Sequence, residues 1–463
     1  MNMLLRAAFA LAATTLAAAA PRTLRVDYYH TGTAASETFA LDRAVLEPLP
    51  WPGDPDKAVD TTNFGKYLFE VVDRATNKVI YSRGFCSVYG EWETTGEARG
   101  AARTFSESLR FPRPDGPVQV NLKKRDARNA FREVWSFTLD PADPAVDTSA
   151  TPAPGELIAI RKSGDPAAKV DLLIIGDGYT RAERPKFERE ARRLADALFA
   201  VQPFKDRQND FNVWGLCPAA ERSGVSRPSV GRHLRSPLGA AYDAFGLERY
   251  VLTFDNRALR DAAAHAPYEF LEILVNGDTY GGAGIFGQFS TVAAGSLWAP
   301  YIFVHEFGHH FAGLADEYYT SPVAYESGPE RPEPWEPNAT ADPRNPKWKA
   351  LVTPGTPLPT PWKKDAFDAH SRETQARRQA LRAAGRPESE IDALFRAQQA
   401  FETGLLGGDV HHGAVGAFEG ANYESRGYYR AQEDCVMFTR DEVPFCAACA
   451  GAIRKVIALY AKP

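Results

Sequence analysis

The residues best suited to chemistry lie between Tyr301 and Tyr319, a stretch that reads YIFVHEFGHHFAGLADEYY. His305 and His309 are four positions apart, and a helix with about 3.6 residues per turn places such a pair on one face. Their imidazole nitrogens can therefore bind one zinc ion together. Glu306 directly follows the first histidine, where its carboxylate can take a proton from a water that the metal activates. The spacing predicts a helical zinc site with a built-in general base.

A catalytic zinc site has a third protein ligand and keeps a further position open for water. We predict Asp316 as this ligand, which requires the turn after the helix to bring its carboxylate back to the metal. The alternative is that Glu317 binds the metal and Asp316 supports it from outside. His310 lies about 100° round the helix from His309, so we expect it to have a structural role.

Gly313 follows the second histidine, and a glycine there can end the helix in the left-handed conformation. In the metzincins, which this region resembles, the glycine and the third ligand each come one residue earlier, and Ala315 stands where their ligand would be. Met437, the one methionine after Met3, lies late in the chain, where a metzincin has its methionine turn. The resemblance implies a metzincin-like α/β metallopeptidase domain.

Several further stretches carry a second resemblance: they are Gly176–Thr180, His305–Tyr318, Phe418–Tyr423, Tyr429–Arg430, Cys435–Met437 and Cys446–Cys449. With these motifs the chain, from about residue 150 to its C-terminus, resembles the bacterial IgA peptidase family of zinc metallopeptidases (metallopeptidase family sixty-four). The resemblance implies an endopeptidase domain after a small β-rich domain, with Zn²⁺ as the cofactor. It also implies that His305, His309 and Asp316 bind the zinc and that Glu306 is the catalytic base.

Amide hydrolysis also needs a donor that stabilises the tetrahedral oxyanion. Tyr423 and Tyr429, in the segment before Met437, are the candidates. We name Tyr429 as the catalytic candidate, and the alternative is that these tyrosines only pack.

The N-terminus predicts export. Met1 to Arg6 is short and basic, Ala7 to about Ala17 is apolar, and small residues continue to Ala20. This pattern is typical of a secretory signal peptide, which we place at residues 1–20. No later segment has the roughly 20 apolar residues that a membrane span needs. We expect an exported protein that is periplasmic, on the cell surface or secreted.

The remaining sequence predicts an α+β protein with two domains. Residues 21–145 have the short alternating strands of a β-sandwich, namely Thr23–Tyr28, Tyr67–Val72, Val79–Arg83, Val118–Leu122 and Val134–Leu139. Residues 146–463 form the predicted catalytic domain, with a continuous apolar strand at Val170–Ile175 and an amphipathic helix at Arg181–Ala200. An insertion of about residues 320–412 interrupts this domain, and we expect helices over Arg372–Phe401.

Residues 276–295 are rich in glycine and precede the zinc helix. They predict either an edge strand to which an extended peptide can add, because small side chains let a backbone approach, or a simple glycine-rich loop.

Composition limits the partners. The formal net charge of -5 argues against nucleic acid. The resemblance to the peptidase family implies a protein or peptide substrate as the partner. Five cysteines in an exported chain favour disulfides. Because Cys435, Cys446 and Cys449 are close in sequence, we predict a structural disulfide among them.

Two other functions fit the same motifs. One is an exported glycan- or protein-binding module with a structural zinc site, in which Glu306 would have no purpose. The other is a zinc amidase that acts on cell-wall material, for which a deep closed pocket is expected instead of a cleft edged by a strand.

Overall fold

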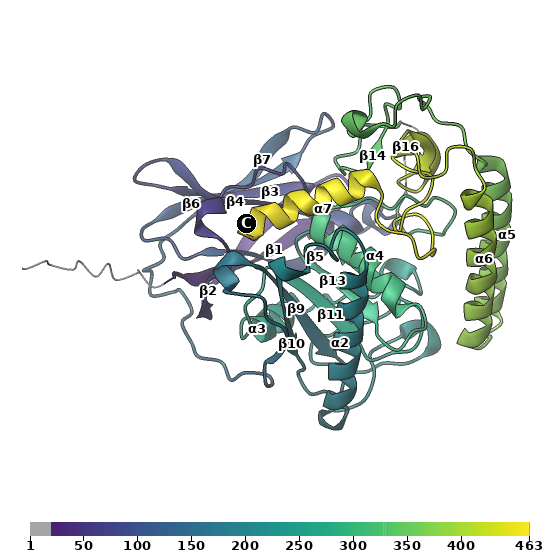
Figure 1. Cartoon of the computed structure of the whole chain (residues 1–463). Helices are drawn as coiled ribbons and strands as arrows, with labels where there is room; N and C mark the ends of the chain where they lie inside the picture. Colours follow the sequence, from purple (N-terminus) through teal and green to yellow (C-terminus); the bar gives the residue numbers. More distant parts are fainter. Residues whose placement is uncertain (1–19, 327, 329, 463) are drawn as a thin grey trace, which may run out of the picture.

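The computed structural model describes residues 20–326, 328 and 330–462 (Figure 1). The predicted signal peptide therefore lies outside the described residues, except for Ala20. In the described part of the chain, no helix is both long and apolar enough to cross a membrane.

The first part of the chain folds into two antiparallel sheets, with strand orders β2-β1-β5 and β4-β3-β6-β7. Their strands are β1 (Arg22–Gly32), β2 (Glu37–Pro50), β3 (Tyr67–Asp73), β4 (Lys78–Phe85), β5 (Arg103–Pro112), β6 (Val118–Arg125) and β7 (Phe131–Leu139), with helix α1 (Val88–Trp92) after β4. Alternate side chains point inward, so Val26 of β1, Val71 of β3 and Val120 of β6 meet in one core. The predicted strands are confirmed, and side chains of both sheets share this core.

The second part is built on a mixed sheet with the order β12-β13-β11-β9-β10-β8. Its strands are β8 (Ile158–Arg161), β9 (Val170–Asp177), β10 (Phe211–Leu216), β11 (Phe270–Val275), β12 (Gly282–Ile285) and β13 (Phe289–Ala293). Adjacent strands from β10 through β9 and β11 to β13 run parallel, whereas the edge strands β8 and β12 are antiparallel to their neighbours. Every residue of β9 is buried, which is why its central part, Leu172–Ile175, is a continuous apolar run and not an alternating one.

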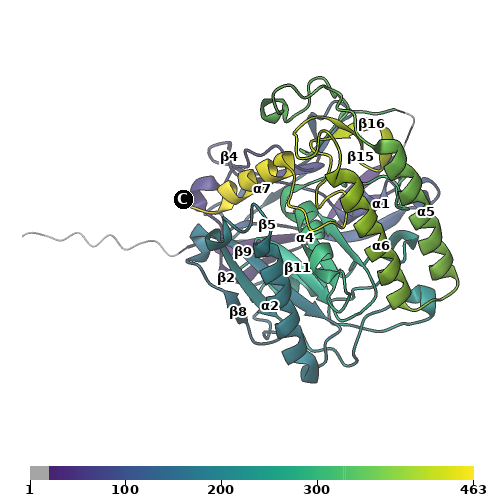
Figure 2. The ribbon, with the colours of Figure 1, turned by 45° about the vertical axis from the view of Figure 1, so that its right-hand side comes forward.

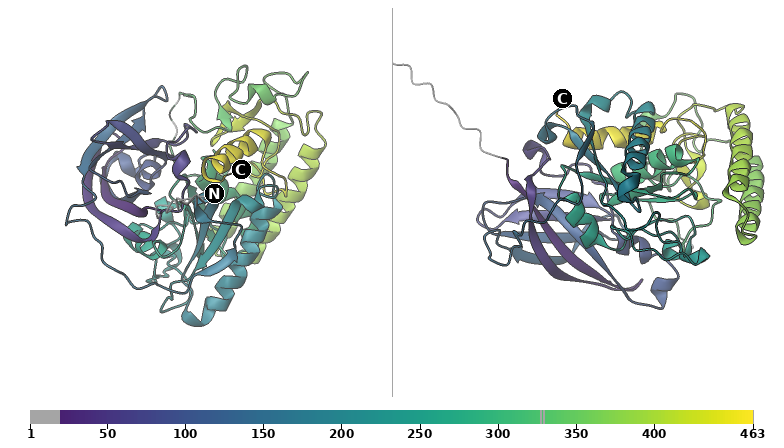
Figure 3. Two further views of the ribbon diagram at one scale, coloured as in Figure 1. Left: turned by 60° about the vertical axis from the view of Figure 1, so that its left-hand side comes forward. Right: turned by 90° about the horizontal axis from the view of Figure 1, so that it is seen from below.

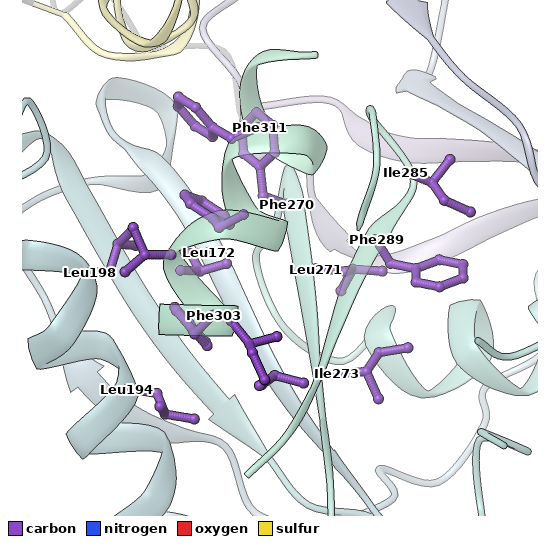
Figure 4. Close-up of a cluster of buried hydrophobic side chains, with 14 of the residues drawn as sticks. Leu172, Leu194, Leu198, Phe270, Leu271, Ile273, Ile285, Phe289, Phe303 and Phe311 are labelled. Atoms are coloured by element: carbon purple, nitrogen blue, oxygen red, sulfur yellow. The ribbon is translucent and has the colours of Figure 1, made fainter. Parts of the chain in front are cut away.

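Helices α2 (Arg184–Ala200) and α4 (Ala299–Ala312) pack against each other and cover this sheet, while α3 (Asn256–Ala263) packs against β5 of the first part. Figure 4 shows the core that α2 and α4 share with the sheet, where Leu198, Phe303 and Phe311 surround Leu172 and Phe270. Burying one such phenylalanine contributes roughly 1.5–3 kcal/mol. This packing fixes the height and rotation of α4 on the sheet.

The insertion adds short strand β14 (Ala339–Thr340) and helices α5 (Lys364–Ala383) and α6 (Glu388–Gly407), which lie side by side at the edge of the molecule (Figure 2). The expected helical stretch is thus confirmed as two helices. Strand β14 joins the hairpin of β15 (Phe418–Ala421) and β16 (Glu424–Arg430) in a small sheet. The C-terminal helix α7 (Ala447–Tyr460) packs on α4.

The two parts of the chain are joined by buried contacts. Figure 3 shows the N-terminal sheets on one side and the α5–α6 pair on the other. The amide of Cys86, just after β4, donates to the carbonyl of Phe286, just after β12, at 2.8 Å. Phe64 and Trp92 of the first part belong to the same core cluster as α4. The N-terminal sheets therefore support the edge of the mixed sheet that lies next to α4.

Candidate metal centre and active-site cleft

Helix α4 presents His305 and His309 on one face. It begins after Trp298 with Pro300 in its first turn and ends at Gly313, whose φ of 59° is the predicted left-handed conformation. A Cβ at Gly313 would lie 2.8 Å from the Trp335 ring, so both its backbone and its surroundings favour glycine.

Three ligand atoms converge beyond this turn. His305 Nε2 and His309 Nε2 are 3.2 Å apart, and Asp316 Oδ1 lies 2.9 Å from the first and 3.2 Å from the second. Ligands at the usual zinc distances of 2.0–2.2 Å in a tetrahedron are about 3.3 Å from one another. The three donors therefore fit one small divalent cation. Glu317 points the other way, toward cysteine side chains.

Both imidazoles are oriented from behind. His305 Nδ1 lies 3.0 Å from the carbonyl of Val436, and His309 Nδ1 lies 2.5 Å from the carbonyl of Leu314. A carbonyl only accepts, so each Nδ1 carries the proton and each Nε2 offers its lone pair. This tautomer is the one that a metal at Nε2 requires.

The charge of the Asp316 carboxylate is stabilised by the neighbouring imidazoles. Burial by itself would raise the pKa of Asp316, but the neighbouring imidazoles of His309 and His305 outweigh it and hold that pKa far below its usual range. For His309, burial by itself would lower the pKa. The Asp316 and Glu306 carboxylates have the larger, opposite effect and raise this pKa to about 9. Asp316 thus carries a negative charge against the two imidazole nitrogens, and this charge suits a cation.

Glu306 lies beside the convergent donors. One of its carboxylate oxygens is within 4.8 Å of nitrogens of both His305 and His309. Burial raises the pKa of Glu306, and the two imidazoles oppose that shift. A half-buried carboxylate with a raised pKa is suited to take up and return a proton.

Met437 is buried beneath α4. A Cβ at Gly308 would lie 3.0 Å from the Met437 sulfur and 3.0 Å from the ring of Phe445. The carbonyl of Met437 accepts a hydrogen bond from the amide of Glu317 at 2.9 Å. Met437 therefore lies between helix α4 and the segment that carries Asp316.

The β15–β16 hairpin supplies a tyrosine to the centre. The Tyr423 hydroxyl donates to Asp316 Oδ2, the carboxylate oxygen that faces away from the imidazoles. The amide of Asn422 donates to the carbonyl of Asp316 at 2.8 Å. Both hairpin residues have positive φ, 51° and 65°, so the turn is bent sharply enough to reach Asp316.

Tyr429, which we named from the sequence, is not brought to these residues. It is paired with Glu419 in β15 and with Thr340 in β14. It does not line the cleft beside Glu306. The hairpin thus presents its turn, and not its far strand, to the donors.

A cleft of about 530 Å³ opens above Glu306, His309 and Asp316. Its walls come from three parts of the chain: the N-terminal sheets with Lys66, Glu91 and Arg125, the strand β12 with Gly282–Phe286, and the later loops with Tyr318, Trp335 and Tyr423. No sequence motif marked the N-terminal wall, because its residues are ordinary surface types from the loop before β3, helix α1 and the end of β6.

Arg249 is a second cleft residue that carries no sequence signal. Its guanidinium donates to the carbonyl of Pro322 at 2.8 Å and lies 3.4 Å from the Tyr318 hydroxyl. The ring of Tyr318 is stacked 6.1 Å from that of His305. Arg249 therefore ties the start of the insertion to the metal helix.

His310 has the structural role expected for it. It is fully buried, its Nδ1 lies 3.1 Å from the carbonyl of Ile285, and its Nε2 accepts from the amide of Leu271 at 3.1 Å. The ring must be neutral to donate at one nitrogen and accept at the other. It fixes α4 to β11 and β12.

Burial accordingly lowers the pKa of His310 from 6.5 to about 3. Below pH 6.5 the unfolded chain binds a proton here that the folded chain excludes. The free energy of unfolding therefore decreases as the pH is lowered. We expect this residue to lower the free energy of unfolding by about 2 kcal/mol when the pH falls from 7 to 5. His310→Gln keeps a donor and an acceptor without titrating, and should lose that part of the pH dependence in urea unfolding. Metal release at low pH affects both proteins equally, so equal pH slopes would contradict the assignment.

The predicted disulfide is wrong. All five cysteines are unpaired, and the sulfurs of Cys435 and Cys449 are 3.9 Å apart, whereas a disulfide bond is about 2.05 Å long. Cys86 and Cys217 are buried elsewhere. Sequence proximity correctly brought Cys435, Cys446 and Cys449 together but gave no sign that the Glu317 side chain joins them.

Comparison with known families agrees with this geometry. Residues 158–457 match the model of the IgA peptidase M64 family, and residues 17–136 match the model of the peptidase M64 N-terminus. No curated protein matches the chain. Since the two models together cover nearly the whole sequence, the chain belongs to the IgA peptidase M64 family and is a metallopeptidase.

Proposed function

We propose that the protein is an exported zinc-dependent endopeptidase in which His305, His309 and Asp316 hold the metal. The carrying observation is the convergence of two Nε2 atoms and one carboxylate oxygen at tetrahedral spacing beside Glu306. Two nitrogens and one oxygen are a usual donor set for catalytic zinc. Zinc, when bound, polarises the scissile carbonyl and lowers the pKa of the attacking water.

Glu306 is the proposed general base and acid. Its carboxylate takes a proton from the attacking water and then delivers it to the departing amine. Its position on the cleft wall beside His309 and Asp316 places it next to the attacking water. A structural zinc site would give Glu306 no function, which favours the enzyme over a binding module.

Tyr423 is the tyrosine that we assign to the reaction centre, in place of Tyr429. Its hydroxyl holds the outer oxygen of Asp316 and so orients the inner oxygen toward the imidazoles. Such a partner behind a ligand tunes metal affinity. Tyr423 is therefore a positioning residue for Asp316.

Strand β12 is the proposed docking edge for substrate. It is the edge strand of the mixed sheet and lines the cleft beside α4. The amide of Gly282 donates to the carbonyl of Arg249 at 3.1 Å, on the side of β12 away from β13. Strand amides alternate in direction, so the amide of Gly284 points to that same outer side, next to the point where Tyr250 bridges Gly282. An extended peptide can add there by strand pairing. A cleft edged by a strand favours a peptide over a small cell-wall amide.

Gly284 sets the distance between this edge and the metal helix. A Cβ there would lie 2.3 Å from the carbonyl oxygen of Glu306 and 2.9 Å from Cβ of His309. We expect Gly284→Ala to cost about 1–3 kcal/mol of stability and to lower kcat/KM roughly 100-fold by displacing the edge. Thermal unfolding and peptide kinetics measure both effects. Gly404→Ala on α6, where an added Cβ meets nothing within 4 Å, is the control, and equal activity of the two variants would rule out the role of Gly284.

The proposed function is tested by incubating a mixed peptide library with the zinc-loaded protein and identifying the products by mass spectrometry. Internal cuts that disappear after chelation and return with zinc support an endopeptidase, and the cut sites define its specificity. Removal of terminal residues alone, or no cleavage by a zinc-loaded protein, would contradict the proposal.

We also propose that residues 1–20 are cleaved as a signal peptide, that residues 21–145 form the N-terminal β-sandwich domain, and that residues 146–463 form a metzincin-like catalytic domain. N-terminal sequencing of the protein recovered outside the cytoplasm tests the first point. An intact Met1 in that fraction would contradict it.

A further inference from the structure

A second cluster of metal-binding side chains lies directly behind Asp316. It consists of Glu317, Cys435, Cys446 and Cys449, whose ligand atoms all lie within 4.8 Å of one another. All four residues are buried. They come from three segments: the residue after Asp316, the residue two before Met437, and the first turn of α7, where Cys446 is the N-cap.

The distances within the cluster match a tetrahedral zinc site. The sulfurs of Cys435 and Cys449 are 3.9 Å apart, and Glu317 Oε1 lies 3.6 Å from the Cys446 sulfur and 3.3 Å from the Cys449 sulfur. With Zn–S near 2.3 Å and Zn–O near 2.0–2.2 Å, tetrahedral ligands are about 3.8 Å apart for two sulfurs and about 3.6 Å for sulfur and oxygen.

The surroundings are prepared for negative sulfur. Backbone amides of Met437 and Cys446 point at the Cys435 sulfur at 3.5 and 3.2 Å, and the amide of Cys449 points at the Cys446 sulfur at 3.5 Å. Amide donors stabilise thiolates, and thiolates are the form that binds metal.

Glu317 itself points to a missing partner. Its side chain is fully buried, and its Oε1 accepts from the Asn338 amide at 3.0 Å. Its Oε2 has no hydrogen-bond partner among the residues that the structure describes. An unpartnered buried carboxylate oxygen is costly unless a cation or donor satisfies it. Glu317 therefore offers one oxygen to the sulfurs of Cys446 and Cys449 and leaves the other for a cation or donor.

We propose that Glu317, Cys435, Cys446 and Cys449 bind a second, structural zinc ion. Three thiolates and one carboxylate favour zinc among the common divalent cations, because magnesium and calcium prefer oxygen ligands alone. The donor set is closed, with four protein ligands, as in structural sites and unlike the centre at His305. The binding releases the thiol protons and oxidises nothing.

This second site would fix the floor of the first. Asp316 and Glu317 are adjacent, so a metal that holds Glu317 restrains the backbone that aims Asp316 at His305 and His309. The same metal holds Cys435, and the next residue, Val436, provides the carbonyl that orients His305. The structural ion therefore links the Asp316 segment, the Met437 segment and helix α7 and holds them in place relative to one another.

Cobalt substitution tests the site in the full chain. Only thiolate ligands give an intense sulfur-to-cobalt charge-transfer band in the near ultraviolet, so this band reports the second site independently of catalysis. We expect it in the reduced wild-type protein and in a His305→Ala, His309→Ala double variant. We expect its loss in a Cys446→Ser, Cys449→Ser double variant, and its retention in Cys217→Ser, which removes a distant buried thiol.

Absence of the band in reduced, folded wild-type protein would overturn the proposal without any variant having to fold. So would quantitative zinc analysis that finds no metal in the His305→Ala, His309→Ala variant. If alkylation under denaturing conditions leaves Cys435 and Cys449 linked in the freshly purified protein, a disulfide replaces the metal. Failure of the peptidase assay alone, with the band present, would affect the proposed function and not this site.

Discussion

Replacing Glu306 by Gln is expected to lower kcat for peptide hydrolysis by roughly 10²- to 10⁴-fold, the usual contribution of a general acid–base group. Gln has nearly the same shape, so the imidazoles of His305 and His309 should keep their positions and the metal content should not change. What is lost is the ability to accept a proton from the attacking water. The measurement is kcat at zinc saturation, together with zinc content and thermal unfolding of the same sample.

Glu272 offers a matched control for this substitution. It is a fully buried carboxyl group in β11, and burial keeps its pKa well above the usual value. Glu272 does not line the cleft, so Glu272→Gln should leave kcat unchanged. If Glu306→Gln retained full turnover with its zinc bound, or if both variants lost activity equally, Glu306 would not be the general base.

The spacing within α4 carried most of the site prediction. A helical period needs only local sequence, so His305 and His309 were predicted to share a face, and Gly313 was predicted to end the helix. The buried strand at residues 170–175 was equally clear, because a continuous apolar run fits a strand covered on both faces. These features depend on contacts between residues close in the chain.

Features that depend on distant segments could not be predicted in the same way. The sequence left Asp316 and Glu317 as alternative ligands, since a turn with one residue more than in the metzincins allows either. The two side chains point in opposite directions, one to the imidazoles and one to the cysteines. That division depends on the Tyr423 turn and on Cys446 and Cys449, more than 100 residues further along. The predicted disulfide failed for the same reason.

The N-terminal wall of the cleft is a further case. Lys66, Glu91 and Arg125 reach the cleft because the two sheets of the first part pack against the end of β12. Their types are those of any solvated surface, so composition gave no signal. The cleft exists only in the assembled chain, which makes the N-terminal sheets part of the substrate-facing surface.

Asp316 and Glu317 are the alternative third ligands, and replacing Asp316 is expected to have a large effect on zinc binding and turnover. Asp316→Ala removes one of three proposed protein ligands, and we expect it to abolish turnover and to weaken zinc binding at the active site by more than 100-fold. The comparison value is the 10- to 100-fold loss that usually follows removal of a group behind a ligand. Tyr423→Phe removes such a group, so its loss of affinity should fall within that lower range.

Zinc affinity is best measured by competition with a chelator, because it separates metal binding from catalysis. In Asp316→Ala, excess zinc should not restore full activity, since the carboxylate that balances the imidazoles is gone. In Tyr423→Phe, excess zinc should restore most of it, because all three ligands remain. Tyr429→Phe is the matched control, as its side chain lies on the far strand of the same hairpin, and it should behave like the wild type.

The opposite ordering would have a definite meaning. If Asp316→Ala kept wild-type affinity at the histidine site while Glu317→Ala lost it, Glu317 would be the third ligand and the carboxylates would exchange roles. The distances argue against this, because Asp316 Oδ1 is within 3.2 Å of both Nε2 atoms, whereas Glu317 is engaged by Asn338 and the cysteine sulfurs. A loss of zinc affinity that increases from Tyr429→Phe through Tyr423→Phe to Asp316→Ala would therefore assign Asp316, and not Glu317, as the third ligand of the metal in the cleft.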